Sequence, residues 1–551
     1  MPPTRSLRLG FGLPLALFLL NFLLTFHNVW PTPWIRYPNE LSIELAVLIL
    51  LLAGYAELVR VPGKTALFGL TLLLLILVLG RYADVTSPAL YGRPINLYWD
   101  MRHLPNVVAM LTTVASPWLV LAIITASVLL LGGLFGLLRG CLSVLWTGLE
   151  QTVTRRLLAA ASAGVVALFM VGHASHKLHT EYWFSLPVSP VYAGQISFAF
   201  EAALGSGRHL PPSPPLDSDL GRLQGEDVLI IFIESYGATV FNNPIFAERL
   251  TPSYEQLGSA IEETGRGVAS AFVTSPTFGG SSWLAHASLL SGIELHNEGH
   301  YQLLLASERE TLVSLFKRQG YRTIGLMPGL QKAWPEGAFY GFDQIYNEAS
   351  LDYQGPAFGW WHIPDQYSLA KLHELELKNQ DRAPVLALFP TTASHIPFLP
   401  VPAYQPDWAQ VLTSEPFPPE ALQDSLAKRP EWFKLGDAYV AAINYELTWL
   451  TGYLHDWAPR DALFVVLGDH QPSANVSGDR ASWDVPVHVI SHNTAVLNAL
   501  VEAGFTPGLT PQRAPLGKTN QLRAILLDSW KSSANNTALT ADNITPPEQD
   551  F

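Results

Sequence analysis

The stretch Val228-Leu229-Ile230-Ile231-Phe232-Ile233, followed by Glu234-Ser235-Tyr236-Gly237, decides the fold class of the carboxyl-terminal part of this chain. Six consecutive apolar residues are typical of a strand buried on both faces of a parallel sheet. Similar runs recur at 321–326, 385–389 and 463–467. Helix-like stretches such as 311–320 and 438–457 lie between them, and strands that alternate with helices indicate an α/β sheet.

Polar residues directly follow two of these runs. Ligands of α/β sheets bind at the carboxyl ends of the strands, so these residues are site candidates. Glu234 follows the first run and is interpreted as a metal ligand, with an ion pair or a helix cap as the alternative. Asp469-His470 follows the run at 463–467 after Gly468. A carboxylate beside an imidazole suits Zn²⁺, and an oxygen-rich set suits Mn²⁺ or Mg²⁺.

Two hydroxyl-rich or histidine-bearing segments add candidates for the chemistry. Gly279-Gly280-Ser281-Ser282 enters a helix-like stretch at 284–290, which would place a hydroxyl at a helix N-terminus, where negative charge is favoured. An ordinary serine N-cap is the alternative. His395 follows the run at 385–389 and could bind a substrate oxygen or act as an acid, whereas a lone core histidine is the simpler interpretation.

The first third of the chain has a different character. Five apolar runs, each near the roughly 20 residues that span a hydrocarbon core, predict five transmembrane helices at 10–29, 41–58, 65–80, 118–138 and 157–173. The basic residues between and before these runs predict which segments are cytoplasmic: Arg5, Arg8, Arg60, Lys64, Arg139, Arg155 and Arg156. Five spans would place everything after about residue 175 outside the cytoplasm.

Composition agrees with this division. Only 14% of the 551 residues are charged and 49% are hydrophobic, against about a quarter charged in soluble domains. Residues 1–174 carry 11 basic and 6 acidic side chains, which leaves 22 basic and 40 acidic residues in the remainder. The net charge of −13 argues against a general nucleic-acid binder, and a single Cys excludes a disulfide scaffold.

These features predict four regions. Residues 1–174 form the membrane domain, and residues 175–224 form a connector with a Pro-rich linker at 211–215. Part of the connector is expected either on the membrane surface or as a buried loop. Residues 225–531 form the catalytic α/β domain, and residues 532–551 form a polar tail.

Taken in order, Glu234, Ser282, His395 and Asp469-His470 resemble the alkaline phosphatase/sulfatase superfamily. The chain looks most like its membrane-embedded members, which include lipoteichoic acid synthases, phosphoethanolamine transferases and the phosphoglycerol transferases of periplasmic glucans. The resemblance implies a five-helix membrane domain followed by an extracytoplasmic, sulfatase-like α/β domain in a bacterial inner membrane.

The resemblance also implies roles for single residues. Glu234, Ser282, Asp469 and His470 would hold one divalent ion, Mn²⁺, Zn²⁺ or Mg²⁺. Ser282 lies ten residues before the Gly of Leu289-Leu290-Ser291-Gly292, as the sulfatase nucleophile does, with Ser281 and Thr277 as alternatives. His395 lies in Ser-His-Ile-Pro, which is similar to an element of the family that contacts the substrate phosphate.

Some family patterns are absent. The residues two and four after Ser282 are Leu284 and His286, which disfavours a formylglycine and with it typical sulfate-ester hydrolysis. The His and Arg that teichoic acid synthases carry before the Ser-His-x-Pro element are missing, which puts glycerol-phosphate polymerisation in doubt. Lys332 and Trp334 are the substrate-contact candidates in that region.

The expected function is metal-dependent transfer of a phosphorylated lipid head group. A membrane phospholipid would be the donor and a glycan or lipid the acceptor, through a covalent Ser282 intermediate. The alternatives are a membrane-anchored phosphoric or sulfuric ester hydrolase of the same superfamily and a non-catalytic scaffold that binds metal and lipid.

Overall fold

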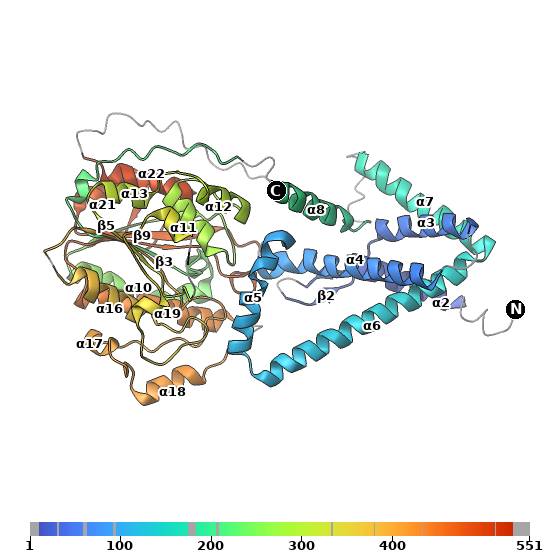
Figure 1. Ribbon diagram of the computed structural model, residues 1–551, viewed down its shortest axis with the longest axis horizontal. Coiled ribbons are helices and arrows are strands. Elements are labelled where there is room, and N and C mark those ends of the chain that lie inside the picture. The colour runs from blue at the N-terminus through green and yellow to red at the C-terminus, as the bar shows by residue number, and fades with distance from the viewer. Residues whose placement is uncertain are drawn as a thin grey trace. The chain divides into compact units, whose positions relative to one another are not determined.

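The computed structural model describes residues 10–29, 32–58, 63–91, 95–174, 183–204, 209–331, 334, 336–379, 381–431, 434–512 and 514–532 (Figure 1). The chain divides into two compact units, Met1–Ser206 and Gly207–Phe551. Lys332 and nearly all of the predicted tail lie outside the described residues.

The first unit consists mainly of apolar helices, and each of the five predicted runs lies largely in one of them. They are α2 (Gly12–Thr25), α3 (Ile43–Leu58), α4 (Lys64–Tyr91), α6 (Pro117–Leu149) and α7 (Thr152–Ala174). Within the described residues, three stretches are long and apolar enough to cross a membrane: Lys64–Leu90, Pro117–Leu149 and Thr152–Gly172. α2 and α3 have 14 and 16 residues, fewer than the roughly 20 that a span needs, so five spans are not confirmed.

Two predicted loop features of this unit are instead helical. α4 continues past Gly80 to Tyr91, and Arg139 lies inside the 33-residue α6. Arg81 of α4 is buried and donates hydrogen bonds to the backbone carbonyls of Thr25, Phe26 and Leu186. Those carbonyls satisfy the guanidinium inside the helical unit.

Two further helices form in segments that lie between the apolar runs or after them. α5 (Leu97–Val114) was not predicted. α8 (Ser189–Leu204) lies in the predicted connector, where it replaces the buried loop that was one of the two expectations. The hydroxyl of Tyr192 on α8 donates to the carbonyl of Ile76 on α4 at 2.7 Å.

The second unit is built on a nine-stranded sheet with the order β10-β4-β9-β8-β3-β7-β5-β6, and β11 pairs with β4. The four predicted apolar runs form its parallel centre: β3 (Val228–Ile233), β5 (Arg322–Leu326), β7 (Val385–Pro390) and β8 (Leu463–Gly468). The remaining strands are β4 (Gly267–Thr274), β6 (Gln344–Tyr346), β9 (Asp484–Ser491), β10 (Thr506–Pro507) and β11 (Pro515–Lys518). β9 runs antiparallel to both β4 and β8, so the sheet is mixed.

Helices cover both faces of this sheet, and β3 is buried along its whole length (Figure 1). Leu229, Ile231 and Ile233 pack into one core with helices α10 (Pro244–Glu263), α16 (Asp365–Leu372) and α19 (Gly436–Asp456). Val228, Ile230 and Phe232 face a second core with α11 (Ser282–Ser291), α13 (Leu312–Arg318) and α22 (Thr519–Trp530). The alternation follows from the two-residue period of a strand.

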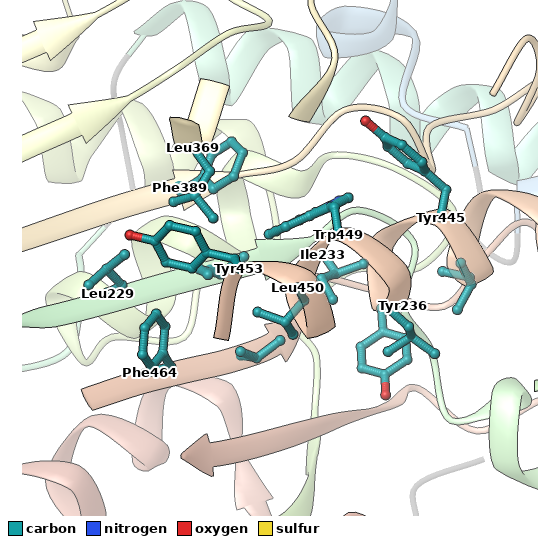
Figure 2. Close-up of a cluster of buried hydrophobic side chains, with 14 of the residues drawn as sticks. Leu229, Ile233, Tyr236, Leu369, Phe389, Tyr445, Trp449, Leu450, Tyr453 and Phe464 are labelled. Atoms are coloured by element: carbon teal, nitrogen blue, oxygen red, sulfur yellow. The ribbon is translucent and has the colours of Figure 1, made fainter. Parts of the chain in front are cut away.

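Aromatic side chains from α19 fill the first core (Figure 2). Trp449 and Tyr453 are fully buried, and Figure 2 shows them beside Phe389 of β7 and Phe464 of β8. Burial of one such large side chain stabilises a fold by about 1.5–3 kcal/mol. This packing holds the strand ends that carry the candidate site.

The Pro-rich segment is extended along the second unit. The carbonyls of Pro211 and Pro214 accept hydrogen bonds from Arg309 and Arg523 at 2.5 and 3.0 Å. This part of the predicted linker is therefore tied to the α/β unit by arginine side chains.

Candidate active site

The register of the two central strands brings three predicted ligands together. Ile233 at the end of β3 is paired with Gly468 at the end of β8, so Glu234 and Asp469-His470 leave the sheet side by side. One ligand atom from each of Glu234, Asp469 and His470 lies within 4.8 Å of the others, and all three residues are buried. Parallel strands place their carboxyl ends at one edge of a sheet, which is why residues so far apart in sequence meet here.

Gly468 permits this arrangement. A Cβ at this position would lie 1.8 Å from the carbonyl oxygen of Tyr236. Only glycine allows the two strand ends to approach so closely. The backbone N–H of Ser235 then donates to Asp469 Oδ1 at 2.8 Å, which fixes one carboxylate oxygen.

Ser282 is the first residue of α11, and its hydroxyl contacts two of the predicted ligands. It donates to Glu234 Oε2 at 2.8 Å and lies 3.1 Å from His470 Nε2. Its position at a helix N-terminus favours negative charge on the oxygen or on a group bound there.

The two alternative nucleophiles are placed differently. Thr277 donates its hydroxyl to the carbonyl of Gly280 in its own loop. Ser281 lies in the left-handed region with φ 64° and makes no side-chain cap hydrogen bond. The cap interpretation of this serine pair is therefore not what the structure shows, and of the three hydroxyls only that of Ser282 has a hydrogen bond to the cluster among the described residues.

The charges of the cluster fit a bound cation. Burial raises the pKa of Asp469, and the Glu234 carboxylate raises it further. Burial would also raise the pKa of Glu234, but His470 outweighs it and holds that pKa below its usual range. Burial alone would lower the pKa of His470, yet Asp469 and Glu234 raise it to about 9. Two buried carboxylates thus require a positive charge between them.

The donor atoms also fit a divalent metal. Asp469 Oδ2 is buried and, among the described residues, has no hydrogen-bond partner, which leaves it free to be a ligand. His470 Nδ1 lies 2.8 Å from the carbonyl oxygen of Gln471. That contact keeps a proton on Nδ1 and directs Nε2 into the cluster, where a bound cation would take the place of the Nε2 proton, as in metal-binding histidines. Two carboxylates and an imidazole suit Zn²⁺ or Mn²⁺.

His395 lies on the loop that follows β7 and faces the same cavity as Ser282. Its Nδ1 lies 2.7 Å from the carbonyl oxygen of Ile396, so Nδ1 carries a proton, and Nε2 makes no hydrogen bond within the described part of the chain. The ring packs edge-on against Trp361, with 5.0 Å between ring centroids. The same loop reaches the metal cluster, because the Glu234 backbone N–H donates to Thr391 Oγ1 at 3.2 Å.

The cavity beside Ser282 has a volume of about 290 Å³. Glu234, Ser282 and His395 line it, and so does Trp334, whose contact with a substrate stays a prediction. Trp334 stacks on Tyr340 with 5.7 Å between ring centroids. Lys332, the other predicted contact, lies outside the described residues.

Most of the cavity wall was missed by sequence reasoning. The additional wall residues are mainly aromatic or aliphatic, and among them are Trp283, Tyr301, Met327, Leu330 and Trp361. No local motif marks them, because they come from segments that meet only in the fold. His286, which stands where a formylglycine motif would have an arginine, also lines the cavity. Burial lowers the pKa of His286 to about 4, so the ring is neutral.

Comparison with known proteins identifies the second unit. Residues 226–498 match the sulfatase family model. The chain carries a sulfatase-family domain. This match confirms the assignment to an enzyme of the sulfatase/alkaline phosphatase superfamily that the ordered residues Glu234, Ser282, His395 and Asp469-His470 suggested. No curated protein sequence matches the chain significantly.

Several solved structures are similar to this chain. One is the integral membrane protein lipooligosaccharide phosphoethanolamine transferase A from Neisseria meningitidis, with 14% identity, coverage of 94% of this chain and 95% of that chain, and a TM-score of 0.48. Another is the lipoteichoic acid synthase LtaP from Listeria monocytogenes, with 16% identity, coverage of 50% and 68%, and a TM-score of 0.35. A third is the periplasmic domain of EcEptC from Escherichia coli, with 15% identity, coverage of 51% and 77%, and a TM-score of 0.34.

Proposed function

We propose that this protein transfers a phosphorylated lipid head group, of the phosphoglycerol or phosphoethanolamine type, from a membrane phospholipid to a hydroxyl of an extracytoplasmic glycan or lipid. The transfer runs through a covalent intermediate on Ser282. The observation that carries the proposal is the Ser282 hydroxyl, which contacts both Glu234 and His470 at the N-terminus of α11 and lines the cavity. A hydroxyl held by a carboxylate and an imidazole is an activated nucleophile.

In this proposal Glu234, Asp469 and His470, with the Ser282 oxygen beside them, hold one divalent ion, Mn²⁺, Zn²⁺ or Mg²⁺. Such an ion supplies Lewis acidity, which favours the ionised form of a nearby hydroxyl and offsets negative charge on phosphoryl oxygens. Two observations support this donor set: Asp469 Oδ2 is buried without a hydrogen-bond partner among the described residues, and His470 directs Nε2 into the cluster.

The chain's own residues then have defined tasks. In the first step the Ser282 Oγ–P bond forms and the bond from phosphorus to the diacylglycerol oxygen breaks. The Ser282 proton leaves toward Glu234 Oε2, its hydrogen-bond acceptor at 2.8 Å. The step requires the imidazolium form of His395, which keeps its Nδ1 proton and gives its Nε2 proton to the leaving oxygen. The first turn of α11 offers backbone N–H groups to the phosphoryl oxygens.

The second step restores the enzyme. The acceptor hydroxyl attacks phosphorus and gives its proton to His395 Nε2. The Ser282 Oγ–P bond breaks, and Ser282 regains its proton from Glu234 Oε2. The aromatic and aliphatic wall of the cavity limits the access of water to the intermediate. Trp334, and Lys332 beside it in sequence, would contact the head group.

The proposal includes the membrane arrangement. Five helices, with α2 and α3 completing the set beyond the three candidate spans, would cross a bacterial inner membrane as a multi-pass domain over residues 1–174. The sulfatase domain would then lie outside the cytoplasm, next to its lipid donor. The many exposed leucines of α6 support contact with lipid, since two of them, Leu129 and Leu130, are about 70% exposed.

The test is the intact mass of the full-length protein after incubation with mixed bacterial phospholipids and Mn²⁺ or Zn²⁺. Ser282→Ala is measured beside the wild type, with Ser281→Gly and Thr277→Val as controls that remove the two alternative hydroxyls. We expect a head-group phosphate adduct on the wild type and on both controls, and none on Ser282→Ala.

The outcomes separate the candidate functions. The mass of the adduct distinguishes phosphoglycerol from phosphoethanolamine. An adduct that persists in Ser282→Ala would contradict the nucleophile assignment. Release of free phosphate or sulfate from simple esters without any acceptor would replace the transferase by a hydrolase of the same superfamily. Metal binding without adduct or turnover would favour the scaffold alternative.

A further inference from the structure

Two carboxyl groups that take no part in the metal cluster lie fully buried beneath the loop that carries His395. Asp365 is the first residue of α16 and Glu446 lies within α19, and both have 0% of their surface exposed. Asp365 accepts from Thr392 and Ala393 and Glu446 accepts from Ser394, so the two carboxyls lie against the same three loop residues and interact electrostatically. Two adjacent buried carboxyls cannot both be ionised without a cation, so the pair must retain a proton.

Counting donors shows which carboxyl is ionised. Asp365 accepts the backbone N–H groups of Thr392 and Ala393 at 2.9 and 2.7 Å, and the Thr392 hydroxyl at 3.2 Å. It also lies in the first turn of a helix, where negative charge is favoured. Its oxygens therefore already accept three hydrogen bonds from the loop, and the remaining acceptor site faces the Glu446 carboxyl. Glu446 must supply the proton of that contact.

Glu446 has its own fixed partners. Its Oε1 accepts the Ser394 hydroxyl at 3.2 Å, and its Oε2 accepts the indole N–H of Trp449 at 2.9 Å. The pair thus contacts three consecutive residues, 392–394, directly before His395. A protonated Glu446 donates a hydrogen bond to Asp365 and at the same time accepts one from the Ser394 hydroxyl.

We infer that Asp365 and Glu446 are positioning residues, a carboxyl pair sharing one proton that fixes the loop after β7 and thereby His395 against the nucleophile. Burial raises the pKa of Asp365 to about 6 and that of Glu446 well above its usual value, the latter further through the charge of Asp365, which agrees with a retained proton. The expected effect on reaction rate rests on the proposed function. The shared proton and the contacts of the pair with the loop can be measured without any assumption about function.

The first experiment measures the pair directly in the full-length protein. Infrared spectroscopy is expected to show the C=O stretch of a buried protonated carboxyl, lost in Glu446→Gln. Hydrogen exchange read by mass spectrometry is expected to accelerate over residues 391–398 in Asp365→Asn, because an NH2 group replaces one of the two oxygens that accept the backbone N–H groups of Thr392 and Ala393. Leu500→Ala, in the fully buried core on α21 (Thr494–Glu502), is the control for general destabilisation.

The second experiment is a double-mutant cycle on adduct formation with His395→Ala. Asp365→Asn is expected to slow the reaction by about tenfold to a hundredfold, from the cost of leaving buried donors unsatisfied. In the His395→Ala background the same change is expected to add little, because Asp365 acts through that histidine. Glu446→Gln, whose amide still donates to Asp365, is expected to stay within about threefold of wild type, whereas Glu446→Leu loses activity.

Several outcomes would overturn the inference. One is a protonated carboxyl band that is the same in wild type and Glu446→Gln. Another is unchanged exchange over 391–398 in both Asp365→Asn and Glu446→Leu. The third is an equal slowing by Asp365→Asn with and without His395. If the wild type forms no adduct at all, the proposed function fails, while the infrared and exchange results still decide whether the pair holds this loop.

Discussion

Gly468→Ala is the change that tests most directly how the fold builds the metal cluster. The added Cβ would lie 1.8 Å from the Tyr236 carbonyl oxygen, whereas Cβ contacts below 3.0 Å essentially do not occur. The ends of β3 and β8 must therefore separate by about an ångström. The next residue is Asp469, whose carboxylate is held by the Ser235 N–H at 2.8 Å.

This displacement is larger than a metal site tolerates. Ligand distances vary by only about 0.2 Å in working sites, so a shift of Asp469 and His470 by an ångström should lower metal affinity by about 100-fold or more. The steric cost to the fold is about 1–3 kcal/mol, which is less than the 5–15 kcal/mol stability of a typical domain. The variant should therefore fold but bind metal poorly.

The assay is calorimetric titration of Zn²⁺ or Mn²⁺ into the full-length protein, together with the rise in unfolding temperature that the metal causes. Gly258→Ala on α10 is the matched control, because a Cβ there meets only Leu509 at 3.8 Å, an ordinary contact. We expect it to bind metal like the wild type. A Gly468→Ala variant with wild-type metal affinity would refute the reasoning.

Two further predictions concern stability of the α/β unit. Arg382 donates to both carboxylate oxygens of Asp227 at 2.7 and 2.6 Å, and the Val385 N–H donates to the same group. Asp227→Ala should therefore lower the free energy of unfolding, measured by urea denaturation, by about 3–5 kcal/mol. A loss below about 1 kcal/mol would contradict this prediction. Burial raises the pKa of Glu226 from 4.5 to about 7, against a hydrogen bond from Asn493. The folded state therefore binds the Glu226 proton more tightly than the unfolded state does. As pH rises from 4.5 to 7, the wild type should lose stability relative to Glu226→Gln. The unfolding temperatures of both proteins measure this loss, and a constant difference between them over that pH range would contradict the prediction.

Local sequence patterns predicted the centre of the α/β unit and its ligands. Four apolar runs form the parallel strands β3, β5, β7 and β8, because continuous apolar segments are stable only where both faces of a sheet are covered. The position of Glu234 and of Asp469-His470 directly after two such strands predicted that they would meet. That prediction needs only the rule that parallel strands end at the same edge.

The strands that contain buried polar residues were not predicted from the sequence. β4 and β9 contain Ser270 and His488, which interrupt their apolar pattern. The two side chains pair across the strands, with Ser270 Oγ 2.7 Å from His488 Nδ1. A polar residue is acceptable in a core when its partner lies on a neighbouring strand, and the sequence alone does not show that partner.

The sequence by itself determined the kinds of residue in the site, and the tertiary structure decided which of them meet. Three neighbouring hydroxyls were possible nucleophiles, and only the start of α11 brings Ser282 to Glu234 and His470. The cavity wall and the Asp365–Glu446 pair are assembled from separate helices and loops. Their members carry no local signal, because hydrogen bonding and van der Waals contact depend on distance in space, which packing fixes across the whole unit.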